Sequence, residues 1–375
     1  MVFIIAISIT LTYLFLISVF IYGFDKVPKF YLDDIPAETQ FSIVIPFRNE
    51  SNNLPQLLKS IKDLQYPIDF FEIILIDDQS EDNSVKIVKT FIENGLKNVT
   101  ILKNEGVNFS PKKEAITKGI SIAKYDWIIT TDADCRVPKH WLNTFDCFIQ
   151  KNNYRLIAAP VNYYDIASFL DRFQTMDILS LMGTTIGAFG VREPFLANGA
   201  NLAYKKTLFT ELSGFEGSDK IASGDDVFLL QKAFKNNPDD VFYLKSIEAT
   251  VETKPQRDWG QLISQRLRWM AKTTHYKSFF GIITGLVVML MNLLLILLIP
   301  VILFDGLSVT DFLYIVIIKF MVDFLLIFKT SRFLQQESVL PIFISASIFY
   351  PFFSLYIIVL SFFKSYTWKG RTFKK

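Results

Sequence analysis

The chain has 375 residues, of which 51% are hydrophobic and 20% are charged. Its 39 basic and 37 acidic side chains leave a formal net charge of +2, which excludes a nucleic-acid-binding protein that depends on a basic surface. The hydrophobic share excludes a disordered chain and argues against a purely soluble enzyme. With only two cysteines and two histidines, the sequence lacks both a disulfide framework and a zinc site of ordinary ligand spacing.

The first apolar stretch, residues 2–24, is nearly uncharged and long enough to cross a bilayer, which takes about 20 residues. A cleaved signal peptide fits less well, because the stretch is too long and no small-residue cleavage site follows it. We therefore predict an uncleaved anchor over residues 1–25. Lys26 and Lys29 come directly after it, and this positive flank places the next part of the chain in the cytoplasm.

Three further apolar stretches predict membrane segments in the C-terminal region: 279–304, 310–328 and 339–363. The middle stretch carries Lys319 and Asp323, which lie four residues apart and so share one helical face. A structural ion pair explains them better than a substrate path does. Three crossings would place the basic tail, 364–375, outside the cytoplasm, against the usual preference of basic segments. One segment is therefore expected to be re-entrant or interfacial, and the sequence leaves open which one.

The region between the anchor and residue 277 alternates short apolar runs with amphipathic stretches. The apolar runs predict strands, and the stretches between them predict helices. Alternation of this kind is typical of an α/β fold with a mostly parallel sheet flanked by helices. The expected strands are 41–46, 71–76, 99–102 and 127–131, and the expected helices lie around 54–61, 85–91 and 112–123.

Acidic residues gather where three of these strands end, which is where parallel α/β sheets place their binding sites. Glu50 follows the first strand, Asp77 and Asp78 follow the second, and Asp132 and Asp134 follow the fourth. Helix capping explains a single acid at such a position but not all three clusters. Two hard oxygen ligands two residues apart suit Mg²⁺ or Mn²⁺, which usually complete their shell with water and phosphate oxygens.

The chain contains no glycine-rich phosphate loop of the P-loop or dinucleotide type, so a diphosphate would be held by metal and side chains. Lys112 and Lys113 open a predicted helix and are candidates to meet that charge, because cations at this position oppose the helix dipole unless an anion is near. Asp225 and Asp226 begin another predicted helix. Capping accounts for one of these two acids and leaves the other available as a general base.

An amphipathic helix is predicted over 258–278, directly before a membrane segment. Gln265, Arg268 and Trp269 fall at i, i+3 and i+4, so an amide, a guanidinium and an indole share one face. The opposite face is apolar, which suits a helix at the membrane interface. The polar face could roof a catalytic pocket or simply reach the membrane surface.

Together these residues resemble the signature of membrane-embedded family 2 glycosyltransferases, the group that includes cellulose synthase, hyaluronan synthase and ceramide glucosyltransferase. The signature D, D-x-D, E/T-D, Q-x-x-R-W appears in order, and the resemblance extends from about residue 41 to 269. Residues 44–50 are similar to the family's first-strand motif, and Lys112, Ala115 and Gly119 to its K-x-x-A-x-x-x-G helix. The signature positions are Asp77 and Asp78, Asp132 and Asp134, Asp225 and Asp226, and Gln265 to Trp269.

The resemblance implies a GT-A nucleotide-diphospho-sugar transferase fold, a UDP-sugar donor and transfer with inversion. Asp226 would then be the catalytic base that deprotonates an acceptor hydroxyl. The other implied roles are donor nucleotide binding by Glu50, Asp77, Asp78, Lys112 and Asp132, metal binding by Asp132 and Asp134, and diphosphate or acceptor binding by Asn198, Gly199, Asp225, Gln265, Arg268 and Trp269.

Three positions depart from the family pattern. Gln79 stands where glycine is usual, Thr117 where asparagine is frequent, and Asp225 where glutamate or threonine is usual. None of these changes removes a catalytic carboxylate. The expected organisation is an anchor (1–25), a GT-A catalytic domain (26–257), an interface helix (258–278) and a C-terminal membrane region of about three segments with a basic tail (279–375).

We therefore expect a multi-pass glycosyltransferase of the inner (plasma) membrane whose cytoplasmic domain moves a sugar from UDP to a lipid-linked or glycan acceptor. Mg²⁺ or Mn²⁺ is the expected cofactor, the bilayer and further membrane subunits are the candidate partners, and no nucleic-acid partner is expected. Two alternatives stay open: a processive polysaccharide synthase, and a non-catalytic membrane scaffold with a transferase-like domain. The small number of membrane segments favours single transfer, and the complete carboxylate set argues against the scaffold.

Overall fold

The computed structural model describes residues 2–106, 110–218, 221, 223–273, 275–304, 306–369 and 371–373. The chain divides into two compact units that alternate along the sequence. The first, here called the membrane unit, contains residues 1–27, 165–195 and 255–375, and the second, the sheet unit, contains 28–164 and 196–254. The sequence analysis treated 26–257 as one continuous domain, whereas residues 165–195 group with the N- and C-terminal helices.

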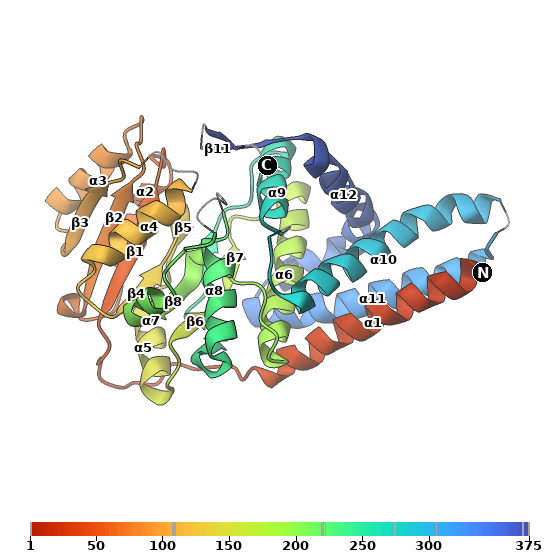
Figure 1. Ribbon diagram of the computed structural model, residues 1–375, viewed down its shortest axis with the longest axis horizontal. Helices are drawn as coiled ribbons and strands as arrows, with labels where there is room; N and C mark the ends of the chain where they lie inside the picture. The colour runs from red at the N-terminus through yellow and green to blue at the C-terminus, as the bar shows by residue number, and fades with distance from the viewer. Residues whose placement is uncertain are drawn as a thin grey trace. The chain divides into compact units, whose positions relative to one another are not determined.

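A seven-stranded sheet forms the centre of the sheet unit (Figure 1). In spatial order its strands are β3 (Val99–Lys103), β2 (Phe71–Asp77), β1 (Phe41–Phe47), β4 (Trp127–Thr130), β8 (Leu202–Lys205), β6 (Leu156–Ala158) and β9 (Val241–Tyr243). The first four run parallel to one another, and β6 is parallel to β9. Only β8 is antiparallel to both of its neighbours. The predicted mostly parallel sheet is confirmed, with one reversed strand among the described residues.

Helices flank this sheet, and a small second sheet adjoins it. The helices are α2 (Leu54–Lys62), α3 (Ser84–Glu93), α4 (Pro111–Ile122), α5 (Trp141–Lys151), α7 (Lys206–Glu211) and α8 (Asp225–Asn236), with short 3₁₀ turns η1 (Ile68–Phe70), η2 (Gly199–Asn201) and η3 (Pro238–Asp240). The second sheet has the order β5 (Cys135–Arg136), β10 (Val251–Thr253) and β7 (Val161–Tyr163).

The two faces of β1 and β2 pack against different helices, as the alternation of side chains along a strand requires. Ile43 and Leu75 belong to a buried apolar cluster that includes the inward face of α2. The opposite face meets α4, where a Cβ on Gly119 would lie 2.9 Å from both Val44 and Ile76. The glycine of the K-x-x-A-x-x-x-G segment thus lets α4 approach the sheet closely, which positions the start of α4 at the sheet edge.

The membrane unit is helical. It contains α1 (Val2–Lys26), α6 (Phe169–Gly190), α9 (Trp259–Thr273), α10 (Phe279–Leu303), α11 (Val309–Leu334), the turn η4 (Glu337–Ile342) and α12 (Phe343–Phe363), followed by a hairpin of β11 (Tyr366–Trp368) and β12 (Arg371–Phe373). Within this unit α1, α10 and α11 lie side by side (Figure 1).

Among the described residues, three helical stretches are long and apolar enough to cross a membrane: α1, α10 and the stretch Glu337–Phe363 that contains α12. The segment predicted at 310–328 does form a helix, α11, but it does not meet this criterion. It carries the predicted ion pair, with Lys319 Nζ 2.8 Å from Asp323 Oδ2. The Tyr13 hydroxyl on α1 donates a 2.6 Å hydrogen bond to Asp323 Oδ1, so these intramembrane polar groups satisfy one another.

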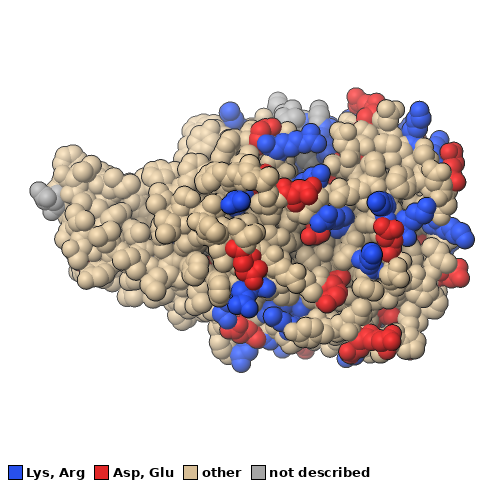
Figure 2. Space-filling model, turned by 180° about the vertical axis from the view of Figure 1, so that it is seen from behind, with Lys and Arg blue, Asp and Glu red and all other residues tan. Residues whose placement is uncertain are grey.

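Large apolar side chains stay exposed on the helices of the membrane unit. Phe3, Leu303 and Met321 are 44%, 76% and 68% exposed, for example. Figure 2 shows that, on the face drawn, described side chains at the end that holds the start of α1 and the end of α10 are nearly all uncharged. An apolar surface of this extent fits contact with lipid rather than with water.

Candidate active site

Strands β1, β2 and β4 end at one edge of the sheet, and the acids predicted from the sequence follow them there. Asp77 and Asp78 are buried, with 7% and 4% of their surface exposed. Asp77 Oδ1 accepts from the Ser80 N–H at 2.9 Å, and Asp78 Oδ1 accepts from the Asn104 amide at 3.0 Å. Asn104, which the sequence analysis did not single out, follows β3, so it reaches the same edge as the two acids.

The loop after β2 is held by Arg48. Its guanidinium donates to the carbonyl oxygens of Asp78, at 2.8 Å, and Gln79, and pairs with Glu81 at 2.9 Å. Gln79 has a φ of +59°, in the left-handed region that glycine adopts without strain. This backbone requirement explains why the family usually has glycine at that position, and it shows that the chain keeps the turn despite the substitution.

Glu50 is buried at the start of the first βα connection. Its Oε2 accepts from the Asn53 amide at 2.7 Å, and its N–H donates to the Ser84 hydroxyl at 2.8 Å. These bonds join the loop after β1 to the start of α3. Glu50 therefore helps to shape this edge of the sheet, and its donor-binding role stays a prediction.

Lys112, the second residue of α4, forms ion pairs with acidic residues from two separate segments. Its Nζ lies 2.7 Å from Asp132 Oδ1, after β4, and 3.3 Å from Asp225 Oδ2, at the start of α8. Burial alone would lower the pKa of Lys112, but the charges of Asp132, Asp225 and Asp226 outweigh it and raise the pKa. Lys112 is therefore a permanent cation between the D-x-D segment and the acids of α8.

Asp226 is held by two backbone N–H groups. Gly199 donates to its Oδ2 at 3.1 Å, and Val227 donates to its Oδ1 at 2.7 Å. It lies in the first turn of α8, where the helix dipole also favours a negative charge. These two bonds, one to each carboxylate oxygen, fix the orientation of the Asp226 side chain.

Gly199 fills a space with no room for a side chain. A Cβ there would lie 2.7 Å from Asp225 Oδ2 and 3.5 Å from Lys112 Nζ. The Thr130 hydroxyl, at the end of β4, donates to the Gly199 carbonyl at 2.8 Å and fixes this turn. The neighbouring Asn198 uses its side-chain oxygen to cap the same turn, accepting from Ala200 at 3.1 Å. The structure thus brings Gly199 together with Lys112 and Asp225, and its role toward the acceptor or diphosphate stays a prediction.

Lys113 does not share the position of Lys112, although the sequence analysis proposed both for diphosphate. Lys113 is 2% exposed, and its ammonium donates to the carbonyl oxygens of Ser218 at 2.6 Å and Ile221 at 3.0 Å. It also lies 4.8 Å from the centre of the Phe228 ring. Successive helical residues point about 100° apart, so Lys113 instead fastens the segment that leads into α8.

Asp134 is exposed and lies two residues beyond Asp132. The Cys135 thiol is 3.7 Å from Asp134 Oδ1, and burial together with Asp134 and Asp132 raises the pKa of that thiol. Cys135 therefore stays neutral and is a poor metal ligand. Among the described residues no group of three or more His, Cys, Asp and Glu side chains converges on a metal position. Two carboxylates still fit a hard cation that keeps water and phosphate ligands.

Gln265, Arg268 and Trp269 lie on α9, in the membrane unit, whereas the acids belong to the sheet unit. All three side chains are half-buried. Their predicted arrangement on one amphipathic helix matches α9, and their contact with substrate stays a prediction.

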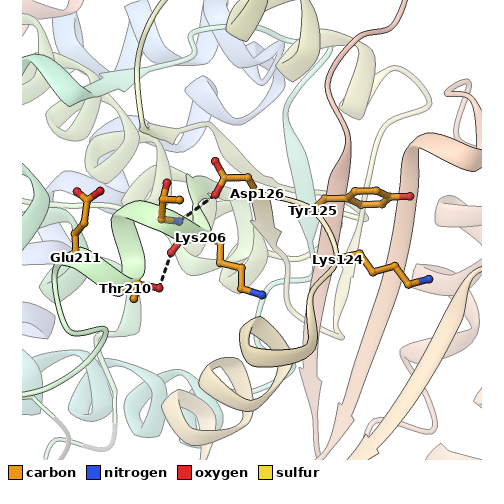
Figure 3. A pocket seen from close by; sticks show the side chains of 7 residues that line it. Lys124, Tyr125, Asp126, Lys206, Thr210 and Glu211 are labelled. Atoms are coloured by element: carbon orange, nitrogen blue, oxygen red, sulfur yellow. Dashed lines mark hydrogen bonds between the residues drawn. The ribbon is translucent and has the colours of Figure 1, made fainter.

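An open hollow of about 510 Å³ lies elsewhere on the sheet unit (Figure 3). It adjoins the start of β4, opposite the edge that carries the acids. Its polar groups are already engaged: Lys206 Nζ donates to the Ala123 carbonyl at 2.8 Å, and Asp126 Oδ1 accepts from the Thr207 N–H at 3.0 Å. The hollow is therefore a packing feature around the end of α4. Its lining residues are Lys124, Tyr125, Asp126, Lys206, Thr207, Thr210 and Glu211.

Comparison with known proteins identifies the part of the chain that carries these acids. Residues 42–213 match the family model for glycosyl transferase family 2. This segment of the chain is therefore similar to family 2 glycosyltransferase domains. The match includes the D-x-D segment and ends before Asp225, so the acids of α8 and the α9 motif lie beyond it.

Two curated relatives align with part of the chain. Poly-beta-1,6-N-acetyl-D-glucosamine synthase of Staphylococcus epidermidis is 31% identical over 149 residues, covering 38% of this chain and 33% of that protein. Undecaprenyl-phosphate 4-deoxy-4-formamido-L-arabinose transferase of Proteus mirabilis is 37% identical over 129 residues, covering 33% and 35%. The chain thus spans about a third of the length of each relative.

One solved structure extends the likeness beyond the matched segment. A mannosyltransferase from Pyrobaculum calidifontis, solved in complex with GDP-Man and Mn²⁺, matches with a TM-score of 0.61 at 14% identity. The match covers 93% of this chain and 98% of that one. The predicted GT-A fold with added helices is confirmed by this likeness and by the family match.

Proposed function

We propose that the protein is an inverting glycosyltransferase that moves a sugar from a UDP-sugar to the hydroxyl of a lipid-linked or glycan acceptor. The observation that carries this proposal is the bridge that Lys112 makes between Asp132 and Asp225. It joins the donor-side acid and the start of α8 in one cluster at the carboxyl edge of the sheet. Such a cluster places a fixed cation where charge develops on a leaving diphosphate.

Asp226 is the proposed base. Its two backbone hydrogen bonds fix the orientation of the carboxylate, which would accept the proton of the acceptor hydroxyl. The acceptor oxygen then forms a bond to the sugar carbon as the bond from that carbon to the diphosphate oxygen breaks. Attack opposite the leaving group inverts the configuration at this carbon.

Asp132 and Asp134 are the proposed ligands of Mg²⁺ or Mn²⁺, because such cations prefer oxygen atoms at a strand end and retain phosphate and water ligands. The bound cation would offset the negative charge of the diphosphate. Glu50, Asp77 and Asp78 would bind the nucleoside, and the second side of the site would comprise Asn198, Gly199, Asp225, Gln265, Arg268 and Trp269.

Two acceptor classes follow from the named relatives. One relative is named as a polysaccharide synthase and the other as a transferase to undecaprenyl phosphate. We favour single transfer to a lipid-linked acceptor at the cytoplasmic face of the inner membrane, because only three helical stretches among the described residues are long and apolar enough to cross a membrane. A processive synthase is the second candidate, supported by the first relative. A scaffold without activity is disfavoured, since Asp132, Asp134 and Asp226 are all present.

The decisive experiment measures UDP release by the detergent-purified protein across a panel of UDP-sugars, with and without Mn²⁺ or Mg²⁺. Polyprenyl phosphate and an oligosaccharide serve as the two acceptor arms. We expect metal-dependent release with one sugar, and a loss of at least about 100-fold in Asp226→Asn, the range of a lost general base. Unchanged release by Asp226→Asn would refute the base assignment. No release with any sugar or acceptor would favour the scaffold.

A further inference from the structure

Arg266 lies inside the Q-x-x-R-W segment without being one of its signature residues. Only 9% of its side chain is exposed. Its Nε and Nη2 atoms lie 2.9 and 2.5 Å from Oδ2 of Asp177, on α6, whose side chain is 7% exposed. Burying either charge without its partner would be strongly unfavourable in free energy. The ion pair therefore links α6 and α9.

The same guanidinium contacts two signature residues. Its Nη1 donates a short hydrogen bond to the side-chain oxygen of Gln265. Its central carbon lies 4.1 Å from the centre of the Trp269 ring, within the range of a cation–π interaction. Arg266 therefore links Asp177 on one side to Gln265 and Trp269 on the other.

A second contact between α6 and α9 lies two turns away. Trp259, seven residues before Arg266, packs on Phe173, four residues before Asp177, with ring centres 5.8 Å apart. Positions four apart share a helical face, so one face of α6 holds α9 by an aromatic contact and by a charged one.

We propose that the Asp177–Arg266 pair is a positioning device for the Q-x-x-R-W motif. It fixes the rotation of α9 about its axis and restrains the side chains of Gln265 and Trp269. The inference rests on the proposed role of that motif in binding the leaving diphosphate and the acceptor. Asp177 and Arg266 act through the motif, so their loss should lower turnover. Nucleotide binding should change little, because its proposed residues belong to the sheet unit.

The test compares four variants of the full-length protein with one control. Asp177→Asn and Arg266→Met each leave one buried charge without its partner. The double variant Asp177→Asn/Arg266→Met removes both charges, so it tests positioning without that penalty. Arg266→Lys keeps the charge but loses the planar guanidinium. Lys329→Ala is the control, because it removes an ion pair of the same unit, 2.7 Å to Asp25, whose side chains are 29% and 58% exposed and so are less covered than Asp177 and Arg266.

We expect each single charge-removing variant to lower kcat at least tenfold and to change the KM for the donor less than threefold. In the double variant, thermal stability should return toward that of the parent while kcat stays low, because the contacts to Gln265 and Trp269 are still missing. Arg266→Lys should retain part of the parent kcat, and Lys329→Ala should retain all of it. Recovery of kcat together with stability in the double variant would show a purely structural pair and overturn the proposal.

A second readout does not depend on catalysis. Backbone amide exchange in α9 should rise in the double variant and stay unchanged in Lys329→Ala. Unchanged exchange in the double variant would overturn the proposal even if activity fell. If the parent protein turned over no UDP-sugar, the proposed function would fail, and the exchange result would still decide whether the pair holds α9.

Discussion

Lys112 and Lys113 are neighbours in the sequence, but the fold gives them different tasks. Lys112 reaches Asp132 and Asp225 at the sheet edge, and Lys113 reaches the carbonyl oxygens of Ser218 and Ile221. Both are cations at the start of α4, where the helix dipole opposes positive charge. Each is retained because it has acceptors of its own, carboxylates in one case and backbone carbonyls in the other.

Replacing each lysine by methionine should separate these two tasks. Lys112→Met removes the cation that faces the diphosphate, so we expect kcat to fall about 100-fold or more, as for a lost electrostatic stabiliser. Lys113→Met removes one of two donors from each carbonyl, because the Ser218 carbonyl also accepts from the Ile221 N–H and the Ile221 carbonyl from the Ser110 hydroxyl. We therefore expect a loss of about 0.5–1.5 kcal/mol of stability for each hydrogen bond removed. The effect of Lys113→Met on kcat should be less than that of Lys112→Met. Thermal unfolding and UDP release check both variants, and the reverse pattern would refute the assignment.

A second prediction at the scale of single residues concerns Gly199. In Gly199→Ala the new methyl group would lie 2.7 Å from Asp225 Oδ2, so the carboxylate must move away from Lys112. The turn is buried, but the atom that the methyl group would meet first is the end of a side chain rather than backbone. We therefore expect the protein to fold and UDP release to fall at least about tenfold, because small displacements of reacting groups are costly. Parent-like UDP release in a folded Gly199→Ala protein would show that this contact is dispensable.

At the scale of helices, α6 depends on close backbone approach to α1. A Cβ on Gly187 would lie 2.4 Å from the Phe20 carbonyl oxygen, and a Cβ on Gly190 would lie 1.8 Å from that of Gly23. Small residues at such crossings let helices pack in a lipid environment, where close van der Waals contact drives their association. The fit explains why residues 165–195 group with the membrane unit although they interrupt the sheet unit in sequence.

Gly187→Ala should therefore destabilise the membrane unit. The atom that the methyl group meets belongs to the backbone of α1, so the helices must separate, at a cost of about 1–3 kcal/mol. Gly285→Ala on α10 is the matched control, since a Cβ there meets nothing within 4 Å. The yield of folded protein in detergent and its thermal unfolding distinguish the two variants. Equal stability of the two would contradict the close α1–α6 crossing.

Much of the sheet could be predicted because its strands are local apolar runs. The predicted strand at 71–76 differs from Phe71–Asp77 by one residue, and the helix predicted at 112–123 is Pro111–Ile122. The reversed strand β8 could not be predicted, because strand direction depends on how the chain returns to the sheet and leaves no periodic signal. For the same reason the sequence did not assign α6 to the membrane helices, since its partners on α1, α9 and α11 are distant in the chain.

The site was predictable only to the level of residue types. Acids that follow strand ends signal a site, because topology brings such ends together. The roles of Lys113 and Arg266 could not be read in the same way. Each depends on an acceptor from a distant segment, Ser218 in one case and Asp177 in the other. A charged residue inside an otherwise apolar helical face is the signal that could have marked them.

At the scale of the whole chain, the sequence left a conflict over the side of the membrane on which the basic tail lies. Composition selects α1, α10 and the stretch with α12 as possible spans. Contacts within the membrane unit instead favour α11, in place of α12, as the third helix that crosses the membrane. Lys329, near the end of α11, pairs with Asp25, near the end of α1, at 2.7 Å. The Tyr13–Asp323 bond joins the same two helices farther along. Helix α11 therefore runs alongside α1 in the same direction.

The surroundings of α12 support a place at the interface. Its Phe349 and Phe353 pack against Trp259, at the start of α9, with ring centres 5.5 and 6.1 Å apart. Strand β11, which follows α12, also lies beside α9. These contacts keep the middle of α12 and the strand that follows it beside α9, which directly precedes the membrane helix α10, so we expect α12 to lie at that membrane face. Three crossings by α1, α10 and α11 would then leave the basic tail on the side of Lys26 and Lys29, as its charge requires.

This topology predicts a labelling pattern in oriented membrane vesicles. Cysteines introduced as Ser308→Cys, between α10 and α11, and Ser365→Cys, after α12, report the two faces through an impermeant maleimide. Background is low, because the native Cys135 and Cys147 are 2% and 1% exposed. We expect Ser308→Cys to react in right-side-out vesicles and Ser365→Cys only in inside-out ones. Reaction of Ser365→Cys in right-side-out vesicles would mean that α12 crosses the membrane, and silence of Ser308→Cys there would mean that α11 does not.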